Sequence, residues 1–145
     1  MELVALYKRV IGLDVLQAQI TACALIEEVD GSVHVEQRQF GAFKRDRREL
    51  ATWAASLRAD EVVMESTGIY WKSPYAALEA VGIRAKVVNA RHVKNVPGRK
   101  TDVGDARWLA TLARAGLLRG SFVPPSKLRE LLSPSRLRVV QRRAA

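Results

Sequence analysis

Three short apolar runs with very short connections constrain the fold of this chain more than any other feature of its sequence. The runs span 10–15, 20–26 and 33–36, and a turn signal at Asp30-Gly31 precedes the last. Short apolar or alternating runs bounded by turn residues are typical of strands. Parallel neighbours need a crossover of about a dozen residues or more, so connections this short predict an antiparallel meander.

Beyond residue 46 the apolar period becomes that of a helix, with an apolar stripe formed by Leu50, Trp53, Ala54 and Leu57. Strands and helices then alternate: a strand at 61–65, a helix with Pro74 in its first turn that ends near 81, a strand at 83–88 and a helix from 102 to about 115. The order β-β-β-α-β-α-β-α predicts an α/β fold with a mixed sheet flanked by helices.

Positive charge is concentrated in the second part of the chain. Residues 1–88 hold 11 basic and 12 acidic side chains, whereas residues 89–145 hold 13 basic and 3 acidic ones. A surface of this sign attracts polyanions, and nucleic acid is the main candidate. From charge alone, a solvated basic tail is an equal alternative.

Length and composition exclude several classes of protein. A chain of 145 residues has room for one ordinary core. It has no apolar run near the roughly 18 residues of a membrane span and no signal-peptide pattern, so we expect a cytoplasmic protein without a membrane partner. Cys23 is the single cysteine, which excludes an internal disulfide and predicts a small buried side chain.

Acidic residues occupy the ends of three predicted elements. Asp14 interrupts the first apolar strand, and Glu65 ends the strand after the first long helix. Asp102 and Asp105 lie in the first turn of the last long helix, and a helical wheel places both on its inward face. Converging carboxylates are the ligands of hard divalent cations, and paired cations clamp the oxygens of a phosphodiester during its cleavage.

Each acid also has an ordinary explanation. Asp102 and Asp105 could simply complement the dipole of their helix, which is worth about 0.3–1 kcal/mol each. Glu65 could be a surface residue at a strand end, and Asp14 could lie on the exposed face of an edge strand. The conjunction of all four acids favours a metal site.

Several motifs occur together in a specific order, namely Gly12-Leu13-Asp14-Val15, Glu65-Ser66-Thr67-Gly68-Ile69-Tyr70, Asn89 with Lys94, and Lys100-Thr101-Asp102-Val103-Gly104-Asp105-Ala106. From about Val10 to Pro125 the sequence resembles the N-terminal domain of the DEDD-type insertion-sequence transposases, bacterial recombinases that use a guide-like bridge RNA. The resemblance implies a ribonuclease-H-like, RuvC-like fold. It also implies that Asp14, Glu65, Asp102 and Asp105 are the catalytic, metal-binding acids, with Mg²⁺ as the ion and Mn²⁺ as its substitute.

The basic segment before the last helix is the second candidate site. By resemblance, Arg91, Lys94, Arg99 and Lys100 contact DNA or a bridge-like RNA near the metal ions. Basic loop residues are more often merely solvated, which is the alternative for each of them. Tyr70 and Trp71 could stack on a base, but aromatic residues beside a turn more often cover the core.

Two departures from the family pattern stand out. Leu16-Gln17 follows the first aspartate, where family members often have a small residue and a lysine. The family also continues through a helical region into a second domain that carries a catalytic serine, and its full-length members work as multimers. We therefore expect a DEDD domain at 1–125, a basic tail or the truncated start of the helical region at 126–145, and no complete transposition by this chain alone.

These observations predict the N-terminal domain of a DNA transposase that binds DNA and cleaves and exchanges phosphodiester strands with a metal ion. Two alternatives remain. The first is a nucleic-acid-binding remnant without catalytic activity. The second is a stand-alone nuclease similar to a junction resolvase.

Overall fold

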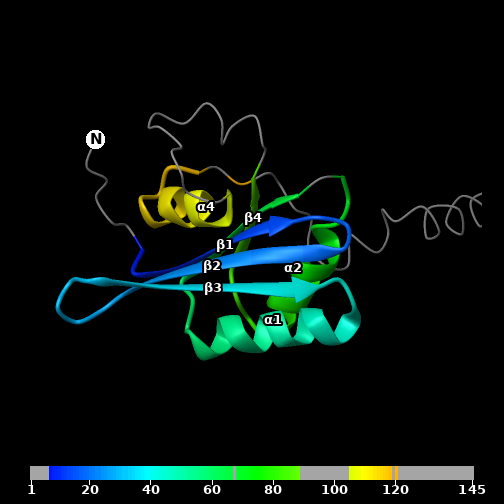
Figure 1. The fold of residues 1–145 in the computed structure, drawn as a ribbon, viewed down its shortest axis with the longest axis horizontal. Coiled ribbons are helices and arrows are strands. Elements are labelled where there is room, and N and C mark those ends of the chain that lie inside the picture. Colours follow the sequence, from blue (N-terminus) through cyan, green and yellow to red (C-terminus); the bar gives the residue numbers. More distant parts are fainter. Residues whose placement is uncertain (1–6, 67, 89–104, 119, 121–145) are drawn as a thin grey trace, which may run out of the picture.

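A mixed sheet of five strands forms the centre of the molecule, which is a computed structural model that describes residues 7–66, 68–88, 105–118 and 120 (Figure 1). The strands lie in the order β3-β2-β1-β4-β5. Strands β1, β2 and β3 pair antiparallel, whereas β1, β4 and β5 pair parallel. The elements are β1 Arg9–Val15, β2 Gln19–Glu27, β3 Val33–Gly41, α1 Lys44–Ser56, β4 Glu61–Ser66, α2 Lys72–Ala80, β5 Ala85–Val88 and α4 Asp105–Arg114.

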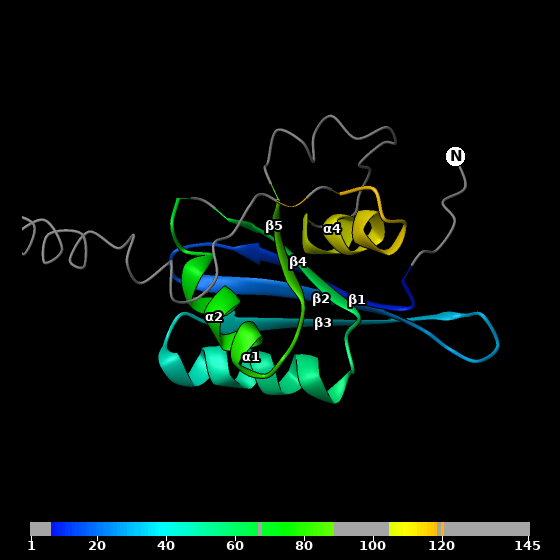
Figure 2. The same ribbon diagram turned by 180° about the vertical axis from the view of Figure 1, so that it is seen from behind.

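The helices cover the two faces of the sheet unequally. α1 and α2 lie side by side on one face, and among the described residues α4 is the helix that covers the other, as Figures 1 and 2 show from opposite sides. The α/β order expected from the sequence is therefore confirmed, including the antiparallel meander. No helix among the described residues is long and apolar enough to cross a membrane.

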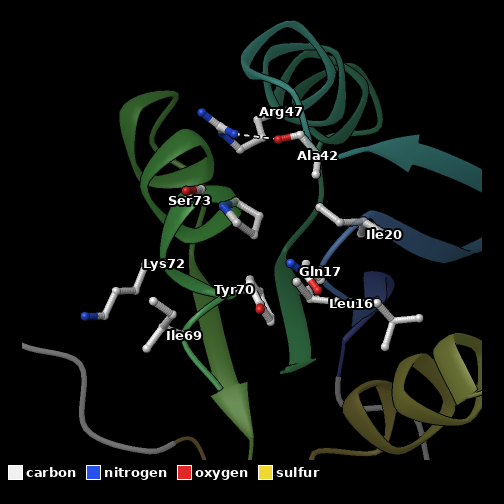
Figure 3. A pocket seen from close by; sticks show the side chains of 11 residues that line it. Leu16, Gln17, Ile20, Ala42, Arg47, Ile69, Tyr70, Lys72 and Ser73 are labelled. Atoms are coloured by element: carbon white, nitrogen blue, oxygen red, sulfur yellow. Dashed lines mark hydrogen bonds between the residues drawn. The ribbon is translucent and has the colours of Figure 1, made fainter. Parts of the chain in front are cut away.

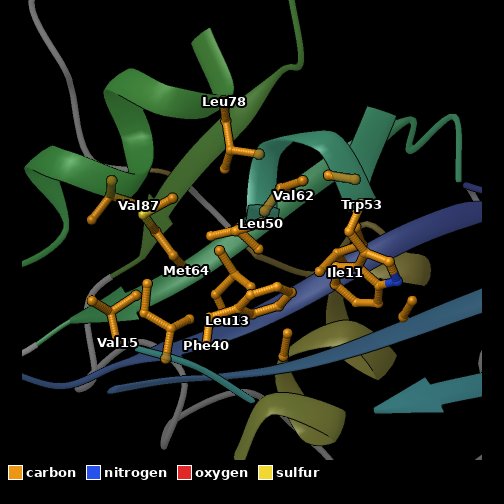
Figure 4. Packing of buried hydrophobic residues seen from close by; sticks show 14 of the residues in the cluster. Ile11, Leu13, Val15, Phe40, Leu50, Trp53, Val62, Met64, Leu78 and Val87 are labelled. Atoms are coloured by element: carbon orange, nitrogen blue, oxygen red, sulfur yellow. The ribbon is translucent and has the colours of Figure 1, made fainter. Parts of the chain in front are cut away.

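The larger core lies between the sheet and the pair α1 and α2 (Figure 4). Ile11, Leu13 and Val15 alternate along β1 and turn toward these helices, where Leu50 and Leu78 are fully buried. Each such side chain contributes about 1.5–3 kcal/mol through its burial. This core fixes β1 and β4 as the rigid centre of the sheet.

Strand β3 is longer than its apolar pattern suggested. The sequence predicted a strand at 33–36, but pairing with β2 continues to Gly41. Gln37, Arg38 and Gln39 are exposed because β3 is an edge strand. Polar residues on such an edge conceal the strand from a pattern search and also discourage pairing between molecules.

Two glycines end helices where the sequence predicted. Gly82 follows α2 with φ 76°, and Gly116 follows α4 with φ 71°. A residue without a side chain adopts this left-handed conformation at little cost, so both glycines serve as helix stops. Residues 102–104, where the last helix was expected to begin, lie outside the described residues.

Candidate metal centre

Asp14 and Glu65 are direct neighbours across the parallel pair β1 and β4. Their Cα atoms are register partners, so they lie side by side on adjacent strands, which are spaced by roughly 4.8 Å. Both residues are half-buried and lie near the carboxyl ends of their strands. The structure thus brings together two of the four acids that the sequence singled out.

Both side chains belong to the sheet face that α4 covers. Alternate residues of a strand share a face, which groups Asp14 with Val10 and Gly12, and Glu65 with Val63. Val10 and Val63 pack into the core under α4. The two carboxylates therefore lie on the α4 side of the sheet, near the carboxyl ends of β1 and β4, and not in the larger core.

Gly12 allows α4 to pack directly on β1. A Cβ atom at Gly12 would collide with the carbonyl oxygen of Ala106 and would lie 2.6 Å from the backbone nitrogen of Ala110. The sequence analysis quoted this glycine only as part of a motif and missed its packing role. A glycine inside an apolar strand is the signal that indicates such a close approach of two backbones.

Helix α4 runs antiparallel to β1, so its first residue lies toward the acid pair. The C-terminal end of α4 is fixed near the start of β1, where the backbone N–H of Tyr7 donates to the carbonyl oxygen of Arg114 over 3.1 Å. Its N-terminal turn contacts Gly12, two residues before Asp14. Asp105, the first residue of α4, consequently lies at the same edge of the sheet as Asp14 and Glu65.

The expected inward orientation of Asp105 is wrong. Asp105 is exposed, whereas the next residue, Ala106, is buried against Gly12. The helical wheel placed Asp105 on the inward face together with Ala106, but it is Ala106 that packs against Gly12 and takes the buried position. Asp102 lies outside the described residues, so its predicted inward orientation stays a prediction.

The four basic candidates Arg91, Lys94, Arg99 and Lys100 also lie outside the described residues. The described residues that flank this segment nevertheless lie close to the candidate acids. It begins after Val88, which is the register partner of Glu65 on β5, and it ends at Asp105. The chain therefore starts and finishes this basic segment next to the candidate site.

The chemistry of these carboxylates fits a hard divalent cation, but the described ranges do not form a complete site. Within them, no three residues of the types His, Cys, Asp and Glu gather closely enough to hold a metal ion. They supply an adjacent carboxylate pair and a third carboxylate at the start of the adjoining helix. Carboxylate oxygens are the ligands that Mg²⁺ takes in proteins. The fourth acid, Asp102, precedes Asp105 by three residues in the sequence and lies outside the described residues.

A further acid on the same sheet face, Glu61, has a structural role. Its side chain is 1% exposed, and its Oε1 lies 2.9 Å from Nζ of Lys86 on β5 and 3.9 Å from Nε of Arg84. The sequence analysis did not single out this residue. Because Glu61 is at the opposite end of β4 from Glu65, it stabilises the sheet and does not join the candidate site.

Cys23 is a buried packing residue, as predicted. It is 1% exposed and lies in the core beneath α4. Burial raises the pKa of its thiol, and a charge effect of Arg107 and a hydrogen bond with Gln37 only partly oppose that shift. The neutral thiol is therefore favoured, which suits a small apolar side chain.

Comparison with known structures supports the fold. RuvC of T. thermophilus, in complex with a Holliday junction substrate, matches with a TM-score of 0.56 at 11% identity over 78% of this chain and 99% of that chain. A second Thermus thermophilus RuvC structure matches at 13% identity with a TM-score of 0.48, over 84% of this chain and 87% of that chain. The Holliday junction resolvase of fowlpox virus matches at 11% identity with a TM-score of 0.44, over 75% of this chain and 95% of that chain.

Comparison at the level of sequence identifies the family. No curated protein matches the sequence. The family model DEDD_Tnp_IS110, described as a transposase, matches residues 11–144 and so covers almost the whole chain. The ribonuclease-H-like, RuvC-like fold expected from the sequence is confirmed. This chain belongs to the family of IS110 DEDD transposases.

Proposed function

We propose that this domain cleaves DNA strands during transposition, and that Asp14, Glu65, Asp102 and Asp105 hold the divalent metal ions that the reaction requires. The register pairing of Asp14 with Glu65 is the observation that carries the proposal. Mg²⁺ is the proposed ion, and Mn²⁺ is its proposed substitute. Bound between such carboxylates, divalent ions polarise a phosphodiester and stabilise its attacking and leaving oxygens.

The protein's own contribution is to hold the acids in place. Asp14 and Glu65 sit on the two central strands of the sheet, whose opposite faces are buried in the larger core. Gly12 keeps α4 against β1, and α4 carries Asp105 at its start. Ligands on packed elements are positioned more firmly than ligands on loops, which favours a preorganised site.

The basic segment is proposed to bind the nucleic acid. Arg91, Lys94, Arg99 and Lys100 belong to a segment that leaves β5 beside Glu65 and returns at Asp105. Because this segment begins and ends beside the acids, its basic side chains would contact the phosphates on either side of the cleaved bond. The partner is DNA, and a bridge-like RNA is the second proposed ligand of this segment.

A stand-alone junction nuclease is the second candidate function. The T. thermophilus RuvC in complex with a Holliday junction substrate is matched over 99% of its chain, and this likeness favours the alternative. Under this alternative the domain would nick branched DNA without any further domain. Under the main proposal the domain would bind metal and DNA, and complete strand exchange would need additional parts of the family's architecture.

The test is cleavage of branched DNA by the purified chain. A labelled four-way junction and a linear duplex of the same sequence would be incubated with Mg²⁺ or Mn²⁺ and analysed for nicks on a denaturing gel. Asp14→Asn removes one candidate ligand, and Glu28→Gln makes the same charge change at an exposed residue near the β2–β3 turn.

Each outcome bears on the proposal. Metal-dependent nicking that is lost in Asp14→Asn and kept in Glu28→Gln supports the proposed metal centre, and nicking of the junction but not of the linear duplex favours the resolvase-like alternative. Without nicking, metal binding and DNA binding that are lost only in Asp14→Asn would support the metal centre but overturn cleavage by this domain alone. DNA binding with no metal response in the wild-type chain would overturn the metal centre and leave a nucleic-acid-binding remnant.

A further inference from the structure

Two adjoining pockets lie on the side of the sheet opposite α4, and together they are called the groove here. The first, of about 290 Å³, lies where β1 ends and α2 begins, and the second, of about 570 Å³, lies between α1 and α2. Arg47 and Ser73 line both pockets, so the two hollows share a wall. Figure 3 shows the first pocket, with Arg47 at its upper rim and Tyr70 near its centre.

The charge of this groove is one-sided. Among the described residues, four cationic side chains and no acidic one line it, and the cations are Lys44, Arg47, Arg48 and Lys72. This is unusual for its surroundings, because residues 1–88 as a whole hold 11 basic and 12 acidic side chains. An unbalanced cluster of cations along a groove attracts a polyanion.

The acids of α1 do not neutralise the groove. Asp46 accepts a hydrogen bond from the backbone N–H of Phe43 over 3.0 Å at the start of the helix. Glu49 lines a third pocket, which shares Arg48 and Thr52 with the groove, so Glu49 lies beside Arg48 but does not line the groove itself. Arg47 donates from Nη1 to the carbonyl oxygen of Ala42 over 2.8 Å, which holds its guanidinium at the groove without cancelling its charge.

The groove also offers apolar surface to its ligand. Eight large hydrophobic side chains are exposed among the described residues, and four of them line the two pockets: Leu16, Ile69, Tyr70 and Val81. A single nucleic-acid strand presents both phosphates and unpaired base faces, whereas a duplex hides the base faces. The combination of cations and apolar surface therefore fits a single strand better than a duplex.

The first pocket lies at the end of β1 that carries Asp14, but on the other face of the sheet. Val15 and Leu16 directly follow Asp14, and Ile69 lies four residues after Glu65. A strand that reaches the acid pair would therefore pass around the carboxyl ends of β1 and β4 to enter the first pocket and then lie between the helices. This route would connect the groove to the bond that is cleaved.

We propose that the groove between α1 and α2 binds one single strand of the DNA that the metal centre cleaves, with Lys44, Arg47, Arg48 and Lys72 as its phosphate contacts. The inference rests on the proposed function in one respect, that the strand is DNA. It adds a binding surface on the side of the sheet opposite α4, made of residues other than the basic segment at 89–104.

The test measures binding of a fluorescein-labelled dT20 strand in EDTA by fluorescence anisotropy, across a range of salt concentrations. The double variant Lys44→Gln and Arg48→Gln changes two exposed residues of the groove. Lys8→Gln and Arg58→Gln together make the same charge change at two exposed residues outside the groove. Each lost phosphate contact lowers the slope of log K against log salt by about 0.7 for a single strand.

We expect the groove variant to lower this slope by about 1.4, which corresponds to roughly 60-fold weaker binding at 50 mM salt beyond any difference at 1 M salt, while the control variant stays near the wild type. Ala80→Glu, which places a negative charge on the α2 wall, should also weaken binding, whereas Ala55→Glu on α1 outside the groove should not. Equal effects of the groove and control variants, with folding preserved, would overturn the proposal that the groove binds the strand.

Other ligands give distinct results. Tighter binding of U20 than of dT20, with the same sensitivity to the groove variant, would overturn the assignment to DNA. Displacement of dT20 by poly-glutamate at equal charge concentration would overturn the assignment to nucleic acid. All measurements omit metal, so a negative result for the groove does not bear on the proposed metal centre. An Asp14→Asn variant that loses its metal response should still bind dT20 through the groove.

Discussion

Gly12 of β1 packs directly against Ala106 of α4, and each of these residues lies within two positions of a candidate metal ligand. Gly12 precedes Asp14 by two residues, and Ala106 follows Asp105 directly. The contact therefore couples the packing of α4 to the geometry of the acids. A change that pushes α4 away from β1 should disturb folding and metal binding together.

Gly12→Ala tests this coupling. The added methyl group would collide with the backbone of α4, so we expect a loss of about 1–3 kcal/mol in the free energy of unfolding. We also expect weaker stabilisation by Mg²⁺, because Asp105 moves with α4. Urea denaturation with and without Mg²⁺ measures both effects.

Cys23→Ala is the matched control for that change. It alters the same face of the sheet but removes volume instead of adding it, since Cys23 packs in the core beneath α4. It should lower stability moderately and leave the effect of Mg²⁺ intact. If Gly12→Ala is as stable as the wild type, the close contact between α4 and β1 is wrong.

Glu65→Gln tests the acid pair by thermal melting. A ligand that binds only the native state at ten times its dissociation constant stabilises that state by about 1.4 kcal/mol. For a domain of this size the melting temperature should rise by about 3–6 °C in the wild-type chain. Glu65→Gln and Asp14→Asn should each remove the rise, because each removes half of the adjacent pair.

Glu28→Gln serves as the control for the melting experiment, since Glu28 is exposed beside the β2–β3 turn. It should keep the full rise with Mg²⁺ or Mn²⁺. An unchanged rise in both Glu65→Gln and Asp14→Asn would mean that metal binds elsewhere, and the proposed centre would be abandoned.

Lys86→Met tests the buried ion pair on the same sheet face. Glu61 is almost fully buried, and Nζ of Lys86 lies 2.9 Å from its Oε1. Removal of the lysine leaves a buried carboxylate with the more distant Arg84, so we expect a loss of about 3 kcal/mol in the free energy of unfolding. Chemical denaturation at pH 7 measures it.

A double variant separates the ion pair from simple packing. Glu61→Leu combined with Lys86→Met replaces both charges by apolar groups and should recover most of the lost stability. Arg84→Met should cost much less than Lys86→Met, because the Arg84 side chain is 68% exposed. A double variant no more stable than Lys86→Met alone would contradict this account.

The sequence predicted the element order because apolar periodicity reports which side of each element is buried. Residues 10–15 and 61–65 read as buried strands with an acid near the end, and both predictions are confirmed. The pairing of Asp14 with Glu65 could not be read from the sequence, because strand register depends on the whole sheet. The two residues lie side by side only in the folded sheet.

Features that depend on packing between elements were missed or misjudged. Asp105 was expected to face inward, but the backbone contact at Gly12 buries Ala106 instead. The groove between α1 and α2 had a weak signal in the cations of α1 and the alanines of α2, yet a groove exists only once two helices are placed beside each other. Asp102 and the basic segment stay predictions, because they lie outside the described residues.

The last prediction concerns the pH dependence of stability and follows from the buried thiol of Cys23. Burial raises its pKa above the ordinary value of about 9.0. The unfolded thiol therefore ionises at a lower pH than the native one, so stability from this group is fully present below about pH 9 and is lost as the pH rises through the native pKa. Cys23→Ala lacks this dependence.

Urea denaturation of the wild-type chain and of Cys23→Ala, at pH 7.5 and at pH 10, isolates the contribution of the thiol, because all other ionisable groups are shared. The stability advantage of the wild-type chain should shrink at the higher pH. Native Cys23 should also react with iodoacetamide far more slowly than the urea-unfolded chain, since it is both buried and protonated. Parallel pH profiles together with rapid labelling of the native chain would show that the thiol is accessible, and the packing of α4 over β2 would need revision.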